Sequence, residues 1–210
     1  MIRVALGIPT INRSDLLQEA LKTYIQTWHK RHILIVDNGN QNITSQSDWV
    51  QIHDPKVNLG VSASWNWIMK RAFEMGYTHI AILNDDIVWK KTISEIETFI
   101  KDNPAGLYTF GGTWCCFIVS YDTFLKVGGF DEGFFPAYFE DNDYCYRCRL
   151  GGIERVVDDF FSPEVYRNSM TIEKNKDLNK NFDVNKAKFT LKWGGEPGKE
   201  QYKIPFDGKR

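Results

Sequence analysis

Two clusters of acidic residues in this chain have the types and spacing to do chemistry. The first, Asn84-Asp85-Asp86, lies between an apolar run over 80–83 and another over 87–89. Adjacent carboxylates repel each other unless a cation lies between them, and Mg²⁺ or Mn²⁺ takes oxygen ligands and is often completed by substrate phosphates. The tripeptide therefore fits a site for a divalent cation and a diphosphate. A solvated turn in which one acid caps the next helix fits it equally well.

The second cluster, Glu140, Asp141 and Asp143, opens a predicted helix over 140–150 and follows the aromatic-rich segment 130–139. A carboxylate beside apolar walls has a raised pKa, which makes it a usable general base. Acidic residues at a helix N-terminus are also favoured by the helix dipole alone. The catalytic and structural interpretations of this cluster are therefore equally supported by the residues themselves.

Alternating strand and helix patterns in the first half of the chain position the first cluster. The expected strands cover residues 2–8, 33–36, 49–53 and 79–83, and the expected helices cover residues 14–25, 62–75 and 92–101. This alternation predicts an α/β fold with a mostly parallel sheet flanked by helices. Ligands bind at the carboxyl ends of the strands in such sheets, so Pro9-Thr10, Asp37-Asn38 and 84–86 are expected to converge on one crevice.

The second half of the chain has a different pattern. It predicts strands at 113–120 and 153–157 and helices at 121–127 and 140–150. From 168 the chain is polar, with few signals except 189–193, so we expect a domain over 1–167 and a basic extension over 168–210 that packs on it. From Thr171 onward ten basic residues face six acidic ones, a balance of +4, which suits either an anionic partner or a solvated end.

Composition limits the classes of protein that this chain can represent. Its 210 residues suit one domain, and a net charge of −1 gives no global field that would favour nucleic acid or membrane. No segment reaches the roughly 20 apolar residues of a membrane span, and the first residues enter a strand directly, so a cytoplasmic location is expected. The four cysteines, Cys115, Cys116, Cys145 and Cys148, are expected to be buried thiols.

Six short motifs in register resemble one enzyme family. They are Ile8-Pro9-Thr10-Ile11-Asn12-Arg13, Ile35-Val36-Asp37-Asn38-Gly39, Asn58-Leu59-Gly60, Leu83-Asn84-Asp85-Asp86, Gly128-Gly129-Phe130-Asp131-Glu132 and Glu140-Asp141-Asn142-Asp143. Together they cover about residues 2 to 157 and resemble the family-two glycosyltransferases of GT-A fold, especially the rhamnosyltransferase-like branch. The resemblance implies a GT-A, Rossmann-like fold and an inverting transfer of a sugar from a nucleotide donor to an acceptor hydroxyl.

The resemblance also implies roles for individual residues. Asp86, the last acid of a DxD-type motif that begins here with Asn84, would ligate a Mn²⁺ or Mg²⁺ ion that bridges the diphosphate. Asp141 matches the family's general base, and Glu140 is expected to bind the acceptor or orient that base. The implied donor-binding residues are Pro9, Thr10, Asn12, Arg13, Asp37, Asn58, Gly60, Asn66, Asn84, Asp85 and Arg167.

The chain departs from the family pattern in two further places. Trp65 stands before Asn66 where many relatives have Arg, and no His follows the last strand to complete the metal shell. Arg167 would then contact the diphosphate directly. The segment Trp193-Gly194-Gly195 either covers the cleft or acts as a structural clasp.

Two alternative functions and several partners stay open. A sugar nucleotidyltransferase would need a glycine-rich basic loop after the first strand, where only Arg13 is basic. A non-catalytic nucleotide-sugar-binding module is disfavoured by the joint presence of Asp86 and Asp141. The acceptor class (saccharide, lipid-linked glycan, protein or modified DNA) is open, as are the oligomeric state and a peripheral location at the inner membrane face.

Overall fold

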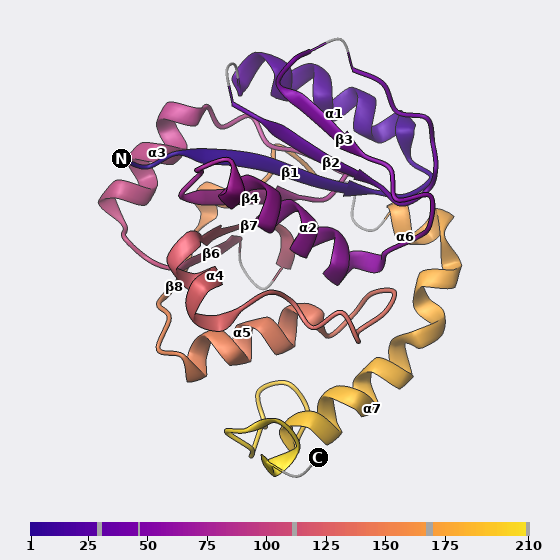
Figure 1. The fold of residues 1–210 in the computed structure, drawn as a ribbon, viewed down its shortest axis with the longest axis vertical. Coiled ribbons are helices and arrows are strands. Elements are labelled where there is room, and N and C mark those ends of the chain that lie inside the picture. The colour runs from indigo at the N-terminus through magenta and orange to yellow at the C-terminus, as the bar shows by residue number, and fades with distance from the viewer. Residues whose placement is uncertain (29–30, 46, 111–112, 167–169, 209–210) are drawn as a thin grey trace.

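A seven-stranded sheet forms the centre of the computed structural model, which describes residues 1–28, 31–45, 47–110, 113–166 and 170–208 (Figure 1). The strands lie in the order β3-β2-β1-β4-β7-β6-β8. They span β1 Val4–Thr10, β2 Ile33–Asp37, β3 Val50–His53, β4 His79–Leu83, β6 Leu107–Phe110, β7 Thr113–Ser120 and β8 Arg155–Val157. A second, two-stranded sheet pairs β5 Ile87–Val88 with β9 Val165–Tyr166.

The direction of the strands determines which residues share an edge of the sheet. β1 pairs in parallel with β2 and β4, so all three carboxyl ends, at Thr10, Asp37 and Leu83, lie at one edge. β7 runs antiparallel to β4, with Cys116 opposite Leu83, and therefore starts near the edge where β4 ends. The expected, mostly parallel α/β sheet is confirmed, whereas β6 and the antiparallel direction of β7 were not foreseen.

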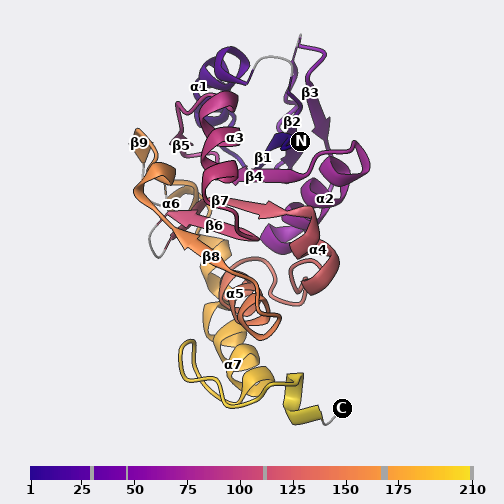
Figure 2. The same ribbon diagram turned by 90° about the vertical axis from the view of Figure 1, so that its left-hand side faces the viewer.

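Helices cover both faces of the sheet (Figure 2). They span α1 Ser14–Thr27, α2 Gly60–Glu74, α3 Ile93–Asp102, α4 Tyr121–Val127, α5 Glu140–Leu150, α6 Met170–Lys174 and α7 Phe182–Trp193, with 3₁₀ turns η1 Asp159–Phe161, η2 Lys176–Asn181 and η3 Pro205–Gly208. α1 and α3 bury their apolar stripes in one core, and α2 and α5 bury theirs in the other. α3 begins with a capping box between Thr92 and Glu95, in agreement with the expected helix start.

The C-terminal segment 170–208 contributes a third apolar cluster. In both views α7 lies below α5 (Figures 1 and 2). Phe189 and Trp193 of α7 are buried with Phe134, Phe139 and Tyr146. Trp193 therefore acts as a structural clasp between α7 and α5. The division of the chain into two parts at residue 167 stays a prediction.

α7 was not expected as a helix, because its apolar residues do not lie on one face. Val184 is 63% exposed and Leu191 is 69% exposed, while Phe189 is fully buried. A helix with apolar side chains around its whole circumference lacks the periodicity from which a surface helix is predicted. Among the described helices, none combines the length and apolar character needed to cross a membrane.

Candidate active site

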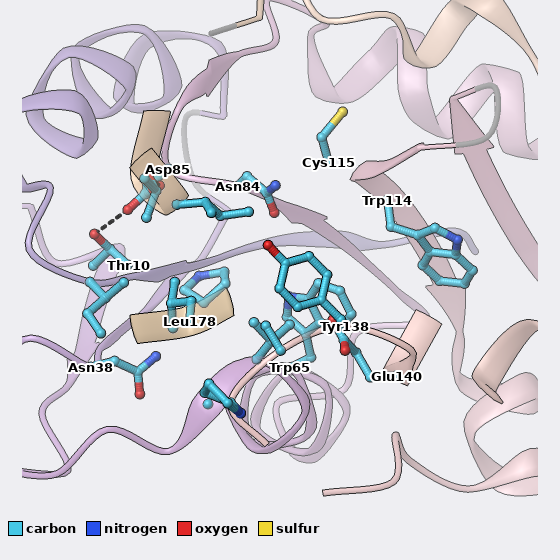
Figure 3. A pocket seen from close by; sticks show the side chains of 18 of the residues that line it. Thr10, Asn38, Trp65, Asn84, Asp85, Trp114, Cys115, Tyr138, Glu140 and Leu178 are labelled. Atoms are coloured by element: carbon cyan, nitrogen blue, oxygen red, sulfur yellow. Dashed lines mark hydrogen bonds between the residues drawn. The ribbon is translucent and has the colours of Figure 1, made fainter. Parts of the chain in front are cut away.

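A cavity of about 260 Å³ lies at the carboxyl edge of the sheet (Figure 3). Asn84, Asp85 and Asp86 at the end of β4 line it, and so do Glu140 and Asp141 in the first turn of α5. Two acidic clusters that are more than fifty residues apart in the sequence therefore open into one space. The edge of the sheet supplies the first cluster, and α5, which packs on one face of the sheet, supplies the second.

Asp85 joins the end of β1 to the C-terminal segment. Its carboxylate accepts hydrogen bonds from the hydroxyls of Thr10 (2.7 Å) and Thr171 (2.6 Å), and only 3% of the residue is exposed. Burial raises the pKa of Asp85 to about 6, although both hydroxyls favour its charged form. Asp85 thus ties Thr10 of β1 and Thr171 of α6 together at the cavity, beside Asp86 in the sequence.

Asp86 has free acceptor capacity in the cavity. It is 5% exposed, and its Oδ1 atom has no hydrogen-bond partner among the described residues. Burial raises the pKa of Asp86, because the charged form loses its hydration. A buried carboxylate oxygen without a partner is unfavourable unless something else satisfies it, and a bound cation would do so.

Glu140 and Asp141 differ in how their carboxyl groups are satisfied. The Oε2 atom of Glu140 is buried without a described partner, and burial raises the pKa of Glu140 well above its usual range. Asp141 is partly exposed and accepts hydrogen bonds from the backbone N–H (2.7 Å) and the side-chain amide (2.8 Å) of Asn142. Burial also raises the pKa of Asp141. Both environments favour a carboxyl group that can take up a proton.

Most of the expected donor-binding residues lie around the same cavity. Pro9 and Thr10 come from the end of β1, and Asn58 and Gly60 come from the start of α2. Gly60 has φ +76°, and a Cβ atom there would stand 2.8 Å from the Phe135 ring, so glycine allows this close approach.

Four other expected donor residues do not line this cavity. Asn12 donates to Asn175 Oδ1 (2.7 Å) beside it, and Arg13 forms a two-pronged pair with Asp15 (3.0 and 3.1 Å). Asp37 is 1% exposed and Asn66 binds the backbone of Phe130.

Asp37 holds its own loop together. Its carboxylate accepts from the N–H groups of Gly39 (3.0 Å) and Gln41 (2.7 Å) and from the Gln41 side chain (2.9 Å). The turn that the sequence indicated at 37–39 thus uses the carboxylate that was expected to hold the nucleotide. Arg167 lies outside the described residues.

The cavity has aromatic walls that sequence reasoning did not assign to the site. Trp65, Trp114 and Tyr138 line it, together with Asn38, Thr171 and Leu178 (Figure 3). The antiparallel direction of β7 brings Trp114 to the edge of the sheet, and no local pattern reveals that direction. Aromatic richness in the chain was the available signal, because rings of this kind suit flat or cyclic ligands.

The ionisable side chains of the described cavity lining are all acidic. Four carboxyl groups (Asp85, Asp86, Glu140 and Asp141) line it, while no Lys, Arg or His occurs among its described lining residues. The described residues also contain no group of three or more metal-ligating side chains. A Mg²⁺ or Mn²⁺ ion held by one or two carboxylates plus substrate phosphates needs no such group, so Asp86 with its unpartnered oxygen fits this kind of site.

Glu140→Gln should change how stability depends on pH. Above the ordinary Glu pKa of about 4.3 the unfolded chain ionises freely, whereas folded Glu140 keeps its proton because its pKa is raised. The stability contributed by neutral Glu140 is therefore lost as pH rises toward its folded pKa. The free energy of unfolding of Glu140→Gln relative to wild type should increase with pH, measured by urea titration across that range.

Glu154→Gln, the same substitution at an exposed residue, provides the control. A pH-independent difference between Glu140→Gln and wild type would contradict the burial argument.

Solved structures of low sequence identity share this fold. Drosophila β1,4-galactosyltransferase 7, in a mutant complex with manganese, UDP-Gal and xylobiose, aligns with TM-score 0.53 and 13% identity over 99% of this chain and 84% of that chain. The catalytic domain of the same enzyme with xylobiose gives TM-score 0.51 and 12% identity over 80% and 72%. A197 from STIV gives 0.50 and 10% over 80% and 87%.

No protein-family model matches the sequence, and no curated protein matches it. The likeness to known proteins is therefore one of fold. The mixed sheet with its flanking helices is the architecture of GT-A-like nucleotide-sugar transferases.

Proposed function

We propose that this protein is an inverting glycosyltransferase that moves a sugar from a nucleotide-sugar donor to an acceptor hydroxyl with the help of a divalent cation. The observation that carries the proposal is that Asp86 and Asp141 line one cavity at the carboxyl edge of the sheet. A phosphate-binding function and a proton-accepting function need separate groups that face the same substrate. The GT-A-like fold supports the same class.

The donor's diphosphate would lie beside Asp86. Because the described lining carries carboxyl groups and no basic side chain, nothing in it balances the charge of an anionic donor unless a cation accompanies the donor. Asp86 would hold this Mn²⁺ or Mg²⁺ ion, with Asn84 and Thr10 near the ribose and phosphates. When bound, the ion would stabilise the negative charge that develops on the departing diphosphate.

Asp141 would act as the general base. Its carboxylate takes the proton of the acceptor hydroxyl while the hydroxyl oxygen bonds to the anomeric carbon and the bond from that carbon to the donor diphosphate breaks. The carbon gains oxocarbenium character, and attack on the face opposite the leaving group inverts its configuration. Asn142 holds the carboxylate in place, and Glu140 would bind an acceptor hydroxyl.

Two other functions would use the same cavity, of which a nucleotidyltransferase would form other products and a binding module would form none. A sugar nucleotidyltransferase would need basic side chains for a triphosphate, and Arg13 is occupied by Asp15. A binding module would need no base. Burial of Glu140 and Asp141 is unfavourable for their charged forms, as their raised pKa values indicate, and such a burden is typical of functional carboxyl groups. We therefore rank both below glycosyl transfer.

The proposal defines the acceptor and the donor sugar by chemical class, and it includes a cellular location. The acceptor would present a hydroxyl to Asp141 from a saccharide, a lipid-linked glycan, a protein or a modified DNA. The aromatic walls suit a cyclic ligand. The resemblance to the rhamnosyltransferase-like branch suggests a hexosyl or deoxyhexosyl donor and action in the cytoplasm.

A thermal-shift panel tests the proposal directly. Nucleotide sugars that bind the native state raise its melting temperature, by an amount set by concentration over Kd. At least one nucleotide sugar should do so with Mn²⁺ present and much less with EDTA. An unchanged melting temperature with every nucleotide and nucleotide sugar, with or without metal, would contradict the proposal.

A further inference from the structure

The two acids of α5 that line the cavity, Glu140 and Asp141, follow a turn with an unfavourable backbone. Tyr138 has φ +77° and Phe139 has φ +71°, and both precede Glu140 directly. Residues with a Cβ atom adopt this left-handed region reluctantly, and two in succession persist only where their surroundings hold them. The direction in which Glu140 and Asp141 enter the cavity depends on this turn, so whatever holds the turn also aims the acids.

One side of the turn is held by Asn185 of α7. Asn185 is 2% exposed, and its amide donates to the backbone carbonyls of Ala137 (2.8 Å) and Phe135 (3.3 Å). These carbonyls lie just before the left-handed pair. A buried side-chain amide with two backbone acceptors is a strong constraint, because losing it leaves polar groups unsatisfied in the interior.

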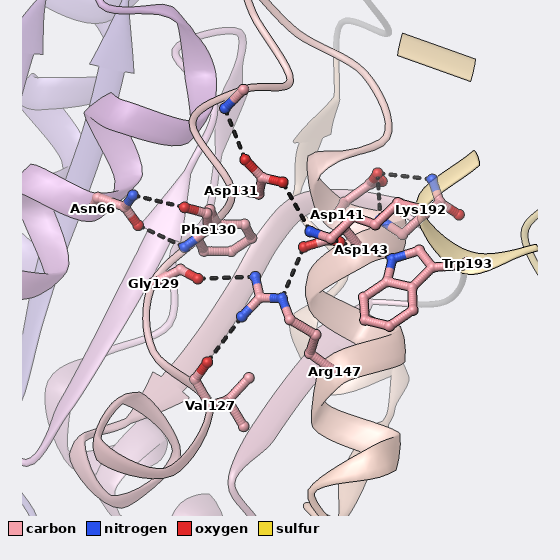
Figure 4. Close-up of polar contacts among 12 residues, drawn as sticks. Asn66, Val127, Gly129, Phe130, Asp131, Asp141, Asp143, Arg147, Lys192 and Trp193 are labelled. Atoms are coloured by element: carbon pink, nitrogen blue, oxygen red, sulfur yellow. Dashed lines mark hydrogen bonds and ion pairs between the residues drawn. The ribbon is translucent and has the colours of Figure 1, made fainter. Parts of the chain in front are cut away.

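The other side is held by Lys192 and Trp193 of the same helix (Figure 4). Lys192 Nζ lies 2.6 Å from Asp143 Oδ1 and 2.8 Å from Asp131 Oδ2, and the indole N–H of Trp193 donates to Asp143 Oδ1 (2.8 Å). Asp143 is fully buried, only two residues beyond Asp141.

Arg147 completes the network from within α5. It pairs with Asp143 Oδ2 (2.8 Å) and donates to the carbonyls of Val127 and Gly129. Asp143 is thus bonded from two helices and linked to the loop before the turn. Breaking a buried ion pair of this kind is strongly unfavourable, so the network fixes the first turn of α5.

We propose that α7 is a positioning element of the active site, in which Asn185 and Lys192 clamp the two sides of the Tyr138–Phe139 turn and so aim Glu140 and Asp141 at the acceptor. The inference rests on the proposed function, because it assigns the C-terminal helix a part in transfer and none in donor binding. A displacement of about 1 Å at a reacting group can lower the rate by about 10²-fold. The extension is thereby a part of the catalytic apparatus.

The test compares Asn185→Ala and Lys192→Met with Lys186→Met in the full-length protein. Lys186 lies on the exposed side of α7 and pairs with Glu196, so it provides the same substitution outside the clamp. Hydrogen exchange measured by mass spectrometry reports on the turn, and steady-state kinetics report on the site. The clamp variants should exchange faster over 134–143 while residues 4–12 and 79–86 keep wild-type protection.

In the kinetics the clamp variants should lose about 10- to 100-fold in kcat for transfer, with donor KM within about twofold of wild type. Lys186→Met should match wild type in both measurements.

Faster exchange over 134–143 with unchanged kcat overturns the inference, and so does unchanged exchange. Equal losses of donor affinity and kcat, with faster exchange throughout the chain, also overturn it, because they indicate general destabilisation. If Lys192→Met does not fold, Asn185→Ala decides, since it removes no charge. A wild-type protein that transfers no sugar contradicts the proposed function, while hydrogen exchange still shows whether α7 holds the turn.

Discussion

Asp141→Asn is expected to remove sugar transfer and to leave donor binding intact. The amide keeps the size of the carboxylate and can still accept from Asn142, but it takes no proton from an acceptor hydroxyl. Since general-base catalysis contributes about 10²- to 10⁴-fold, kcat should fall by about that factor. Transfer rates and the donor-induced thermal shift, measured on the same preparation, give the two readings.

The stability of Asp141→Asn separates loss of chemistry from loss of fold. Burial raises the pKa of Asp141, so its charged form disfavours the folded state at neutral pH, and a neutral amide should melt no lower than wild type. Asp122→Asn, in the exposed first turn of α4, is the matched control and should be fully active. Full transfer by Asp141→Asn would mean that another group is the base.

Asp86→Ala is expected to abolish the metal-dependent part of donor binding. Asp86 contributes an unpartnered buried oxygen at the strand end of the cavity, and the described lining holds no basic side chain that could replace a lost cation. Loss of a group that merely orients a metal ligand weakens metal binding by about 10- to 100-fold, so loss of the ligand should weaken it at least tenfold. Calorimetric titration of a nucleoside diphosphate with and without Mn²⁺ measures the effect.

The control for this substitution is Asp102→Ala at the exposed end of α3, which should bind donor like wild type. The donor affinity of Asp86→Ala should no longer respond to Mn²⁺. A wild-type response to Mn²⁺ in Asp86→Ala would place the cation elsewhere.

Strand-end logic predicted the core of the site from the sequence. Parallel strands share an edge, and this brought Thr10 and Asp86 together as expected. The position of Asp141 in the same cavity was expected only from the family resemblance that the six motifs carry. No local sequence pattern relates a strand end to a helix more than fifty residues later. The α/β class and most helix positions were likewise predictable, since their periodicity is local.

What the sequence could not predict depends on partners far apart in the chain. The donor-binding role implied for Asp37 stays a prediction, but its hydrogen bonds from Gly39 and Gln41 were not foreseen. Lys192 looked like part of a solvated basic tail, yet it is 7% exposed because Asp131 and Asp143 compensate its charge. Burial of a charged side chain follows from its ion pairs, which only the tertiary structure reveals.

The central claim is that Asp86 and Asp141 serve one reaction in one cavity. The most direct test is the release of nucleoside diphosphate from a panel of nucleotide sugars with Mn²⁺, by wild type, Asp86→Ala and Asp141→Asn, with candidate acceptors and with water alone. The account predicts release by wild type with at least one donor, faster with an acceptor, and its loss in both variants, with metal-dependent donor binding kept only in Asp141→Asn. Release of pyrophosphate in place of nucleoside diphosphate, or equal turnover by all three proteins, would contradict it.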